Sequence, residues 1–165
     1  MGIESEEFDR VFPELFASAF RAARRILLTE AEAEDAAAEA LAKTLMHWRK
    51  VAGLAHRDAW VVRVAINCAL DMARKRRAPP AQPDPIPDPA DAAALRFALV
   101  AALSELPRRQ REVIALRYLG DLSSVEVADA LGISNNSVKK HAARAMHSLR
   151  NTVGPGLGED SFALD

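Results

Sequence analysis

Residues 123–144 read SSVEVADALGISNNSVKKHAAR and form the most informative local motif of the chain. Ser123 to Glu126 form a capping box that would start a helix, and Gly132 suits the tight turn after it. Ser134 would cap a second helix, and Ala128 is small enough for the point where two steeply crossing helices approach. The stretch therefore predicts a helix-turn-helix, although short capped helices separated by glycine also occur in ordinary bundles. We expect five apolar residues to fill the angle between its helices: Val125, Val127, Leu131, Ile133 and Val138.

The second helix of this motif would carry the side chains that read DNA. A helix-turn-helix inserts its second helix into the major groove with the N-terminal end toward the bases. Asparagine can pair with adenine through two hydrogen bonds, and lysine or arginine can reach guanine or phosphate. We expect Asn136, Lys140 and His141 to face bases and Lys139 and Arg144 to lie nearer the backbone. The full candidate set is Asn135, Asn136, Ser137, Lys139, Lys140, His141 and Arg144.

Apolar residues at three- and four-residue spacing predict helices in the first half of the chain. The first runs over about residues 5–28, and a capping box at Thr29 and Glu32 opens a second that ends near Trp48. The periodicity lapses around Gly53, so residues 49–57 are expected to form a loop before a third helix at about 58–76. That third helix is apolar over so much of its circumference that it must be largely buried.

A proline-rich segment separates these helices from a second group. Residues 78–89 combine abundant proline with only negative charge, which is typical of an extended, semi-rigid linker. Beyond it, Asp91 could cap a helix, Pro107 suits the first turn of another, and Gly120 suits a left-handed terminator. The sequence predicts an all-α fold with two small helical domains, at 5–77 and 92–151. A Pro-rich acidic linker at 78–91 joins them, and a flexible acidic tail follows at 152–165.

Charge and composition narrow the function classes. The formal net charge is only −1, but basic residues form separate blocks at 74–77, 108–111 and 139–144, as a DNA-binding protein requires. A membrane-spanning apolar run and a basic leader are missing, so we expect a soluble, cytoplasmic protein without membrane insertion. Cys68 is the one cysteine and lies in a helical pattern, which favours a buried structural thiol over a redox role.

Two pairs of segments carry a family resemblance. LPRRQREVIALRY at 106–118 and LSSVEVADALGIS at 122–134 resemble region four of bacterial sigma factors. AEAED at 31–35 and AWVVRVAINCALD at 59–71 resemble region two. With both regions in this order and a short linker between them, the chain resembles the extracytoplasmic-function class, over about residues 8–150. Region four alone is less specific, because response regulators end in similar helices.

The resemblance implies a division of labour. The partners would be core RNA polymerase, duplex promoter DNA with its melted single strand, and an anti-sigma factor, with a monomer as the free form. The helix described above would read the upstream promoter element. The downstream element would be read, and an extruded base held, by Trp48, Arg49, Lys50, Arg57, Asn67, Asp71, Arg74 and Lys75. Polymerase would be bound by Glu34, Asp35, Ala38, Glu39, Ala42 and Leu45.

The chain departs from the family pattern in its polymerase-binding helix. Alanines follow Asp35 where the family usually has leucine, valine and glutamine, and Leu41 and Leu45 stand where large aromatics are common. We therefore expect weaker binding to core polymerase or dependence on an accessory factor. In the recognition helix, His141 replaces a usual arginine and Asn135 with Asn136 replaces a smaller pair, so promoter preference should differ.

Three other functions compete with this interpretation. A polymerase-independent DNA-binding regulator would use the same final helices, but would leave the first half without a purpose. A sigma-like decoy could instead sequester an anti-sigma factor. An enzyme with a metal site near His47, His56, Asp58 and Asp71 lacks compact ligand spacing, so we expect no catalytic residues, no metal and no cofactor.

Overall fold

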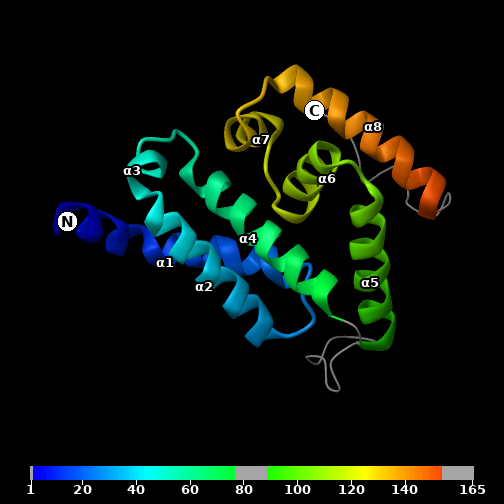
Figure 1. The fold of residues 1–165 in the computed structure, drawn as a ribbon, viewed down its shortest axis with the longest axis horizontal. Coiled ribbons are helices and arrows are strands. Elements are labelled where there is room, and N and C mark those ends of the chain that lie inside the picture. Colours follow the sequence, from blue (N-terminus) through cyan, green and yellow to red (C-terminus); the bar gives the residue numbers. More distant parts are fainter. Residues whose placement is uncertain (1, 77–88, 154–165) are drawn as a thin grey trace.

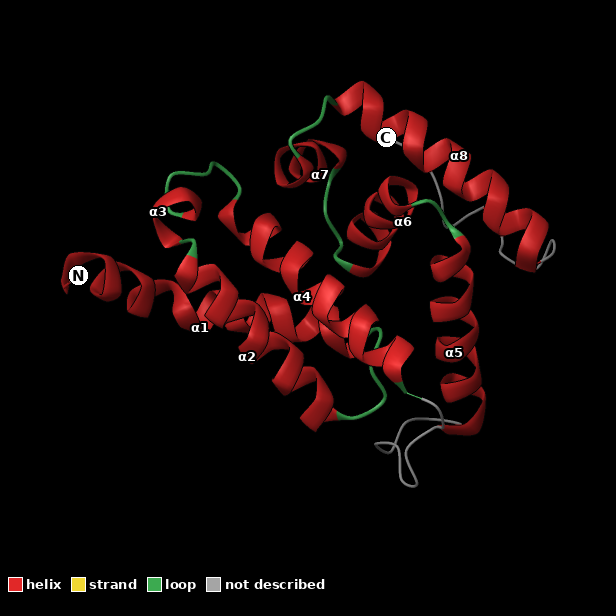
Figure 2. Ribbon diagram, in the orientation of Figure 1, coloured by secondary structure: helices red, strands yellow, loops and turns green. Residues whose placement is uncertain are grey.

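The computed structural model describes residues 2–76 and 89–153, which are almost entirely helical and contain no β-strand (Figures 1 and 2). The first unit consists of α1 (Gly2–Arg24), α2 (Glu30–Met46), the short α3 (Trp48–Val51) and α4 (Arg57–Lys75). The second consists of α5 (Pro89–Glu105), α6 (Arg108–Ile114), the π-helical turn η1 (Ala115–Leu119), α7 (Ser124–Leu131) and α8 (Asn135–Val153). The predicted all-α class is confirmed. Most of the predicted linker and tail lie outside the described residues.

The capping signals act as the sequence predicts. Thr29 accepts a hydrogen bond from the Glu32 amide at 3.3 Å, and Glu32 accepts one from the Thr29 amide at 3.2 Å. Ser123 and Glu126 make the same reciprocal pair at the start of α7. These bonds satisfy amides that have no partner within the helix, so they fix where α2 and α7 begin.

Three local predictions are wrong. The expected loop at 49–57 overlaps α3. Trp48 and Val51 are buried and hold this helical turn against the rest of the first unit. Asp91 lies inside α5, which begins at Pro89. Gly120 has a φ of −86°, and Asp121 takes the left-handed conformation instead, with a φ of 56°.

A close approach explains the glycine at position 120. A Cβ added there would lie 2.8 Å from Cγ1 of Val62 and 3.3 Å from Cδ1 of Ile66, both on α4. It would also lie 2.7 Å from the carbonyl oxygen of Leu116. Gly120 is therefore needed for tight packing against α4. The glycine with a left-handed backbone is Gly132, whose φ is 64° in the turn between α7 and α8.

The two units pack directly on each other through α4. One apolar cluster runs from Ile26 and Ile66 in the first unit to Leu116 and Val127 in the second. Figure 1 shows α4 between α1 and α2 on one side and α6 and α7 on the other. Under this double contact eight residues of α4 are buried and only four are exposed, as its apolar pattern predicts. In this structure the units are therefore in direct contact.

Hydrogen bonds across this joint come from arginines of the first unit. Arg25 donates to the carbonyl oxygen of Leu119 at 2.8 Å, and Arg63 donates to that of Ala130 at 3.1 Å. Both carbonyls lie at helical C-termini, where partial negative charge favours a cation. The first unit therefore caps two helical ends of the second.

Candidate nucleic-acid interface

The N-terminal half of α8 presents the predicted recognition face. Its buried side is formed by Val138, Ala142 and Ala145, each no more than 1% exposed, which pack toward α6 and α7. Because residues three and four apart share a helix face, the polar residues lie on the opposite side. Five of them are exposed: Asn135, Asn136, Lys139, Lys140 and Arg144.

Two members of the upstream set are less accessible. Ser137 is half-buried, and its hydroxyl lies 2.9 Å from that of Ser134, which caps α8. His141 is also half-buried, and its Nδ1 atom is buried without a hydrogen-bond partner among the described residues. Val125, expected to fill the angle between the helices, is 56% exposed, because α7 turns Ser124, Val127 and Leu131 inward instead.

The predicted downstream residues separate into two groups. Trp48 is 3% exposed, and its ring packs edge-on against that of Phe8 with the ring centroids 5.1 Å apart, so this structure places it in the core of the first unit. Arg49 and Lys50 follow it on α3 and are exposed, whereas Arg57 is half-buried and lies 3.9 Å from a carboxylate oxygen of Glu7.

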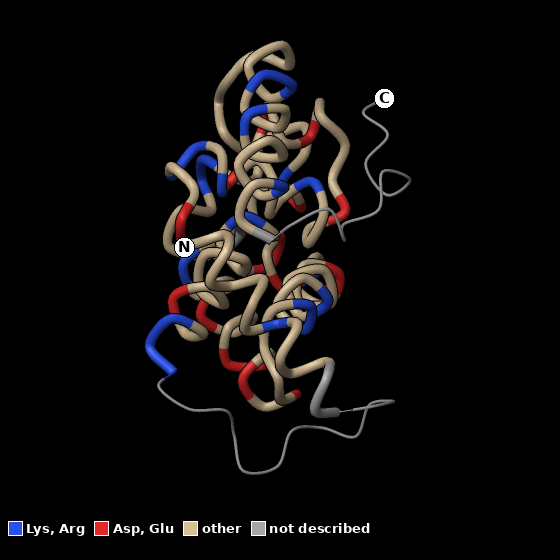
Figure 3. The backbone as a smooth tube through the Cα atoms, turned by 90° about the vertical axis from the view of Figure 1, so that its right-hand side faces the viewer, with Lys and Arg blue, Asp and Glu red and all other residues tan. Residues whose placement is uncertain are grey.

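The second downstream group lies along the C-terminal half of α4. Asn67, Asp71, Arg74 and Lys75 recur at helical spacing, and Figure 3 shows the basic end of this helix where the described chain stops. Arg74 lies 3.6 Å from Asp71 and donates a hydrogen bond to the hydroxyl of Ser104 on α5 at 3.2 Å. A residue predicted to read DNA is therefore held by the second unit.

The six predicted polymerase-binding residues share one face of α2. All of them are exposed, and the opposite face is buried through Ala33, Ala36, Ala37, Ala40, Leu41 and Thr44. Leu41 is 2% exposed, so it contributes to the core rather than to this surface, while Leu45 is 48% exposed. Met46 is 81% exposed beside it and was missed, although its position next to Leu45 placed it at the same helix end.

Glu39 on this face has a fixed partner. Its carboxylate lies 2.6 Å from Nζ of Lys43 one turn later. This hydrogen bond is the main reason that the pKa of Glu39 is lowered and that of Lys43 is raised. The pair keeps both charges at neutral pH on the predicted polymerase-binding face.

Cys68 is buried, as predicted. Burial is the main cause that raises the pKa of its thiol, and Nζ of Lys43 lies 3.5 Å from its sulfur. A raised pKa means less thiolate at neutral pH, and thiolate is the reactive form. This environment fits a structural thiol.

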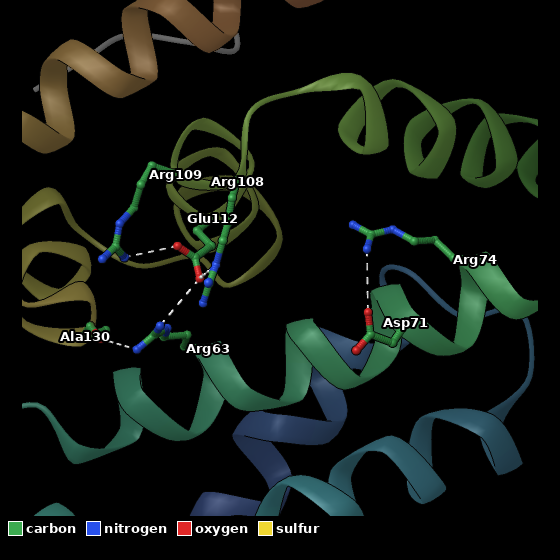
Figure 4. Close-up of polar contacts among 7 residues, drawn as sticks. All are labelled: Arg63, Asp71, Arg74, Arg108, Arg109, Glu112 and Ala130. Atoms are coloured by element: carbon green, nitrogen blue, oxygen red, sulfur yellow. Dashed lines mark hydrogen bonds and ion pairs between the residues drawn. The ribbon is translucent and has the colours of Figure 1, made fainter.

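Sequence reasoning missed the polar cluster at the joint. Glu112 on α6 is 6% exposed and lies near Arg63 of α4 at 3.4 Å, Arg109 at 3.1 Å and Arg108 at 3.6 Å (Figure 4). A lone carboxylate within the basic run RRQRE was the available signal. Its partner Arg63 could not be found from spacing, because it lies in the other unit.

No described helix is long and apolar enough to cross a membrane.

Known proteins share both units. The model of Sigma-70 region 2 matches residues 16–78, and that of Sigma-70 region 4 matches residues 96–149. An RNA polymerase sigma-E factor of Streptomyces coelicolor is 33% identical over 92% of this chain and 86% of its own length. The ECF RNA polymerase sigma factor SigG of Mycobacterium tuberculosis is 32% identical over 81% of this chain and 45% of its own.

Solved structures share the fold. CnrH, in complex with the cytosolic domain of CnrY, has a TM-score of 0.56 and 24% identity, over 90% of this chain and 88% of that one. The sigma factor RpoE in complex with the anti-sigma factor NepR from Bartonella quintana has the same TM-score and 20% identity, over 92% and 99%. With two matched regions in order and relatives along nearly its whole length, the chain belongs to the extracytoplasmic-function class of RNA polymerase sigma factors, which bind core polymerase and promoter DNA and direct transcription initiation.

Proposed function

We propose that three surfaces of this sigma factor divide its work. The exposed face of α8 reads the upstream promoter element, the C-terminal half of α4 with α3 reads the downstream element, and the exposed face of α2 binds core polymerase. The observation that supports this most is on α2, where all six residues predicted from sequence lie on one exposed face. The chain would act in the cytoplasm and would catalyse no reaction of its own. Its two domains would span residues 5–77 and 92–151.

Run-off transcription tests this function directly. Core polymerase with the purified chain, on a promoter library, should give discrete start sites that core polymerase alone does not give. A polymerase-independent regulator or a decoy would give none. Light scattering of the free chain should show a monomer, whereas an obligate dimer would favour the regulator.

Lys140 tests the assignment of α8. Its exposed ammonium should contact the DNA, so Lys140→Ala should weaken binding to the upstream element and reduce the magnitude of its salt slope by about 1. Arg150→Ala, an exposed change near the other end of α8, is the matched control. An unchanged slope in Lys140→Ala would contradict the proposed orientation of this helix.

An anti-sigma factor is a proposed partner. CnrH and RpoE, whose folds resemble this one, are each seen with a second protein, and in the case of RpoE that protein is an anti-sigma factor. A decoy function is the second candidate, and the alanine-rich face of α2 favours it because Ala38 and Ala42 offer polymerase little contact area. Promoter-specific transcription by core polymerase together with the purified chain would exclude the decoy function.

A further inference from the structure

An open cavity of about 250 Å³ lies at the joint between the two units. Asn67, Asp71 and Arg74 of α4 line one side, and Arg108, Arg111 and Glu112 of α6 line the other. Figure 4 shows the side chains of Asp71 and Arg74 rising from α4 into the space beside α6. The cavity is therefore built from both matched regions and exists only while they are packed together.

Its carboxylates are already neutralised by arginines. Asp71 lies 3.6 Å from Arg74 on its own helix. Glu112 lies within 3.6 Å of three guanidinium groups, those of Arg63, Arg108 and Arg109. Positive charge therefore exceeds negative charge around the cavity.

Arg111 has no anionic partner of this kind. It is half-buried, and no carboxylate of the described residues lies within 4.0 Å of its guanidinium. Burial is the main cause that lowers the pKa of Arg111 and the positive charge of Arg74 is the next, while the carboxylates of Glu112 and Asp71 offset only part of this lowering. A partly buried cation beside other cations is unfavourable, and an anion placed among them would relieve that cost.

We propose that this cavity binds a small anion carrying one or two phosphate groups, with Arg74, Arg108 and Arg111 as the main donors. Guanidinium groups match phosphate oxygens through paired hydrogen bonds. The basic residues that line this cavity are all arginines. The volume lies below the roughly 300–1,000 Å³ of cavities that hold drug-sized ligands, which favours a small ion as the occupant.

Such an anion would stabilise the packed arrangement, because its donors come from both units. It would also occupy Arg74, which is proposed to read the downstream element. The site itself goes beyond the proposed function, since binding requires neither polymerase nor promoter.

Calorimetric titration of the full chain with inorganic pyrophosphate tests the site, with sodium chloride adjusted to constant ionic strength. We expect one saturable site per chain. Arg111→Gln should weaken binding at least about tenfold, which corresponds to about 1.4 kcal/mol. Arg10→Gln, an exposed change in the N-terminal half of α1, should bind as the original chain does.

Arg108→Gln is the second variant. Its side chain is 75% exposed, so the fold should tolerate the change even where Arg111→Gln fails to fold. It should weaken pyrophosphate binding severalfold. Unsaturable binding, or equal affinity in the folded arginine variants and the original chain, would overturn the proposal.

A short duplex of random sequence separates the two sources of phosphate. If Arg111→Gln weakens duplex binding while pyrophosphate does not bind, the arginines contact DNA backbone and the small-anion site is rejected. Run-off transcription without pyrophosphate tests the proposed function separately, so the two failures are distinguishable.

Discussion

Glu112 is the residue on which the joint depends most. Its side chain is 5% exposed and has three arginines around it, two from its own helix and one from α4. Burying a single carboxylate is costly, and charged hydrogen bonds offset that cost here. Glu112 therefore links the stability of the second unit to its contact with the first.

We predict that Glu112→Gln lowers the free energy of unfolding by about 1–3 kcal/mol, because it removes the charged hydrogen bonds that the buried carboxylate accepts from Arg63 and Arg109. Urea denaturation followed by circular dichroism measures this. Glu105→Gln, an exposed change at the end of α5, should stay within about 0.5 kcal/mol of the original chain. Equal stability in both variants would show that Glu112 contributes nothing to the joint.

The helices show how far local sequence determines local structure. The bounds of α2 and α7 could be predicted because capping boxes mark their starts, and Gly132 marks the end of α7. The π-helical turn at 115–119 and the short α3 could not, since both depend on packing against distant residues. The candidate face of α8 followed from the helix-turn-helix motif and that of α2 from the family resemblance, whereas the burial of Trp48 and Leu41 required the tertiary structure.

The exposed face of α2 yields a second prediction. Ala42 is exposed between Ala38 and Leu45 on the proposed polymerase-binding face, where a larger side chain would add apolar contact. Ala42→Leu should tighten binding to core polymerase about threefold to tenfold. Fluorescence titration with labelled core measures this, and Ala143→Leu, exposed on α8, is the control. We expect the original chain alone to bind more weakly than nanomolar, and nanomolar binding would contradict that.

The whole molecule is two units held by a joint that the sequence could only half predict. The apolar circumference of α4 indicates burial, but it does not say that the second unit provides part of the cover. Cross-unit partners such as Arg63 and Ala130 are 67 positions apart, so no spacing rule connects them. If the two units are to contact both promoter elements at once, polymerase or DNA has to change this packed arrangement.

We predict that Arg63→Ala favours separation of the units, because it removes both the bond to Ala130 and the pairing with Glu112. Small-angle X-ray scattering should show a radius of gyration several ångströms larger than the roughly 15 Å expected for a compact chain of this length. Arg57→Ala, whose partner Glu7 lies in the same unit, should leave the curve unchanged. Identical curves for Arg63→Ala and the original chain would contradict the role of Arg63.

The continuous apolar cluster has a spectroscopic consequence. Both tryptophans, Trp48 and Trp60, belong to the first unit, so intrinsic fluorescence reports on that unit, whereas far-ultraviolet dichroism reports on helices throughout. If the shared cluster makes the chain melt as one body, the two signals will superimpose on a single temperature curve. In a variant whose units have come apart, the emission and dichroism curves would diverge, which turns an ordinary melting experiment into an assay of contact between the halves.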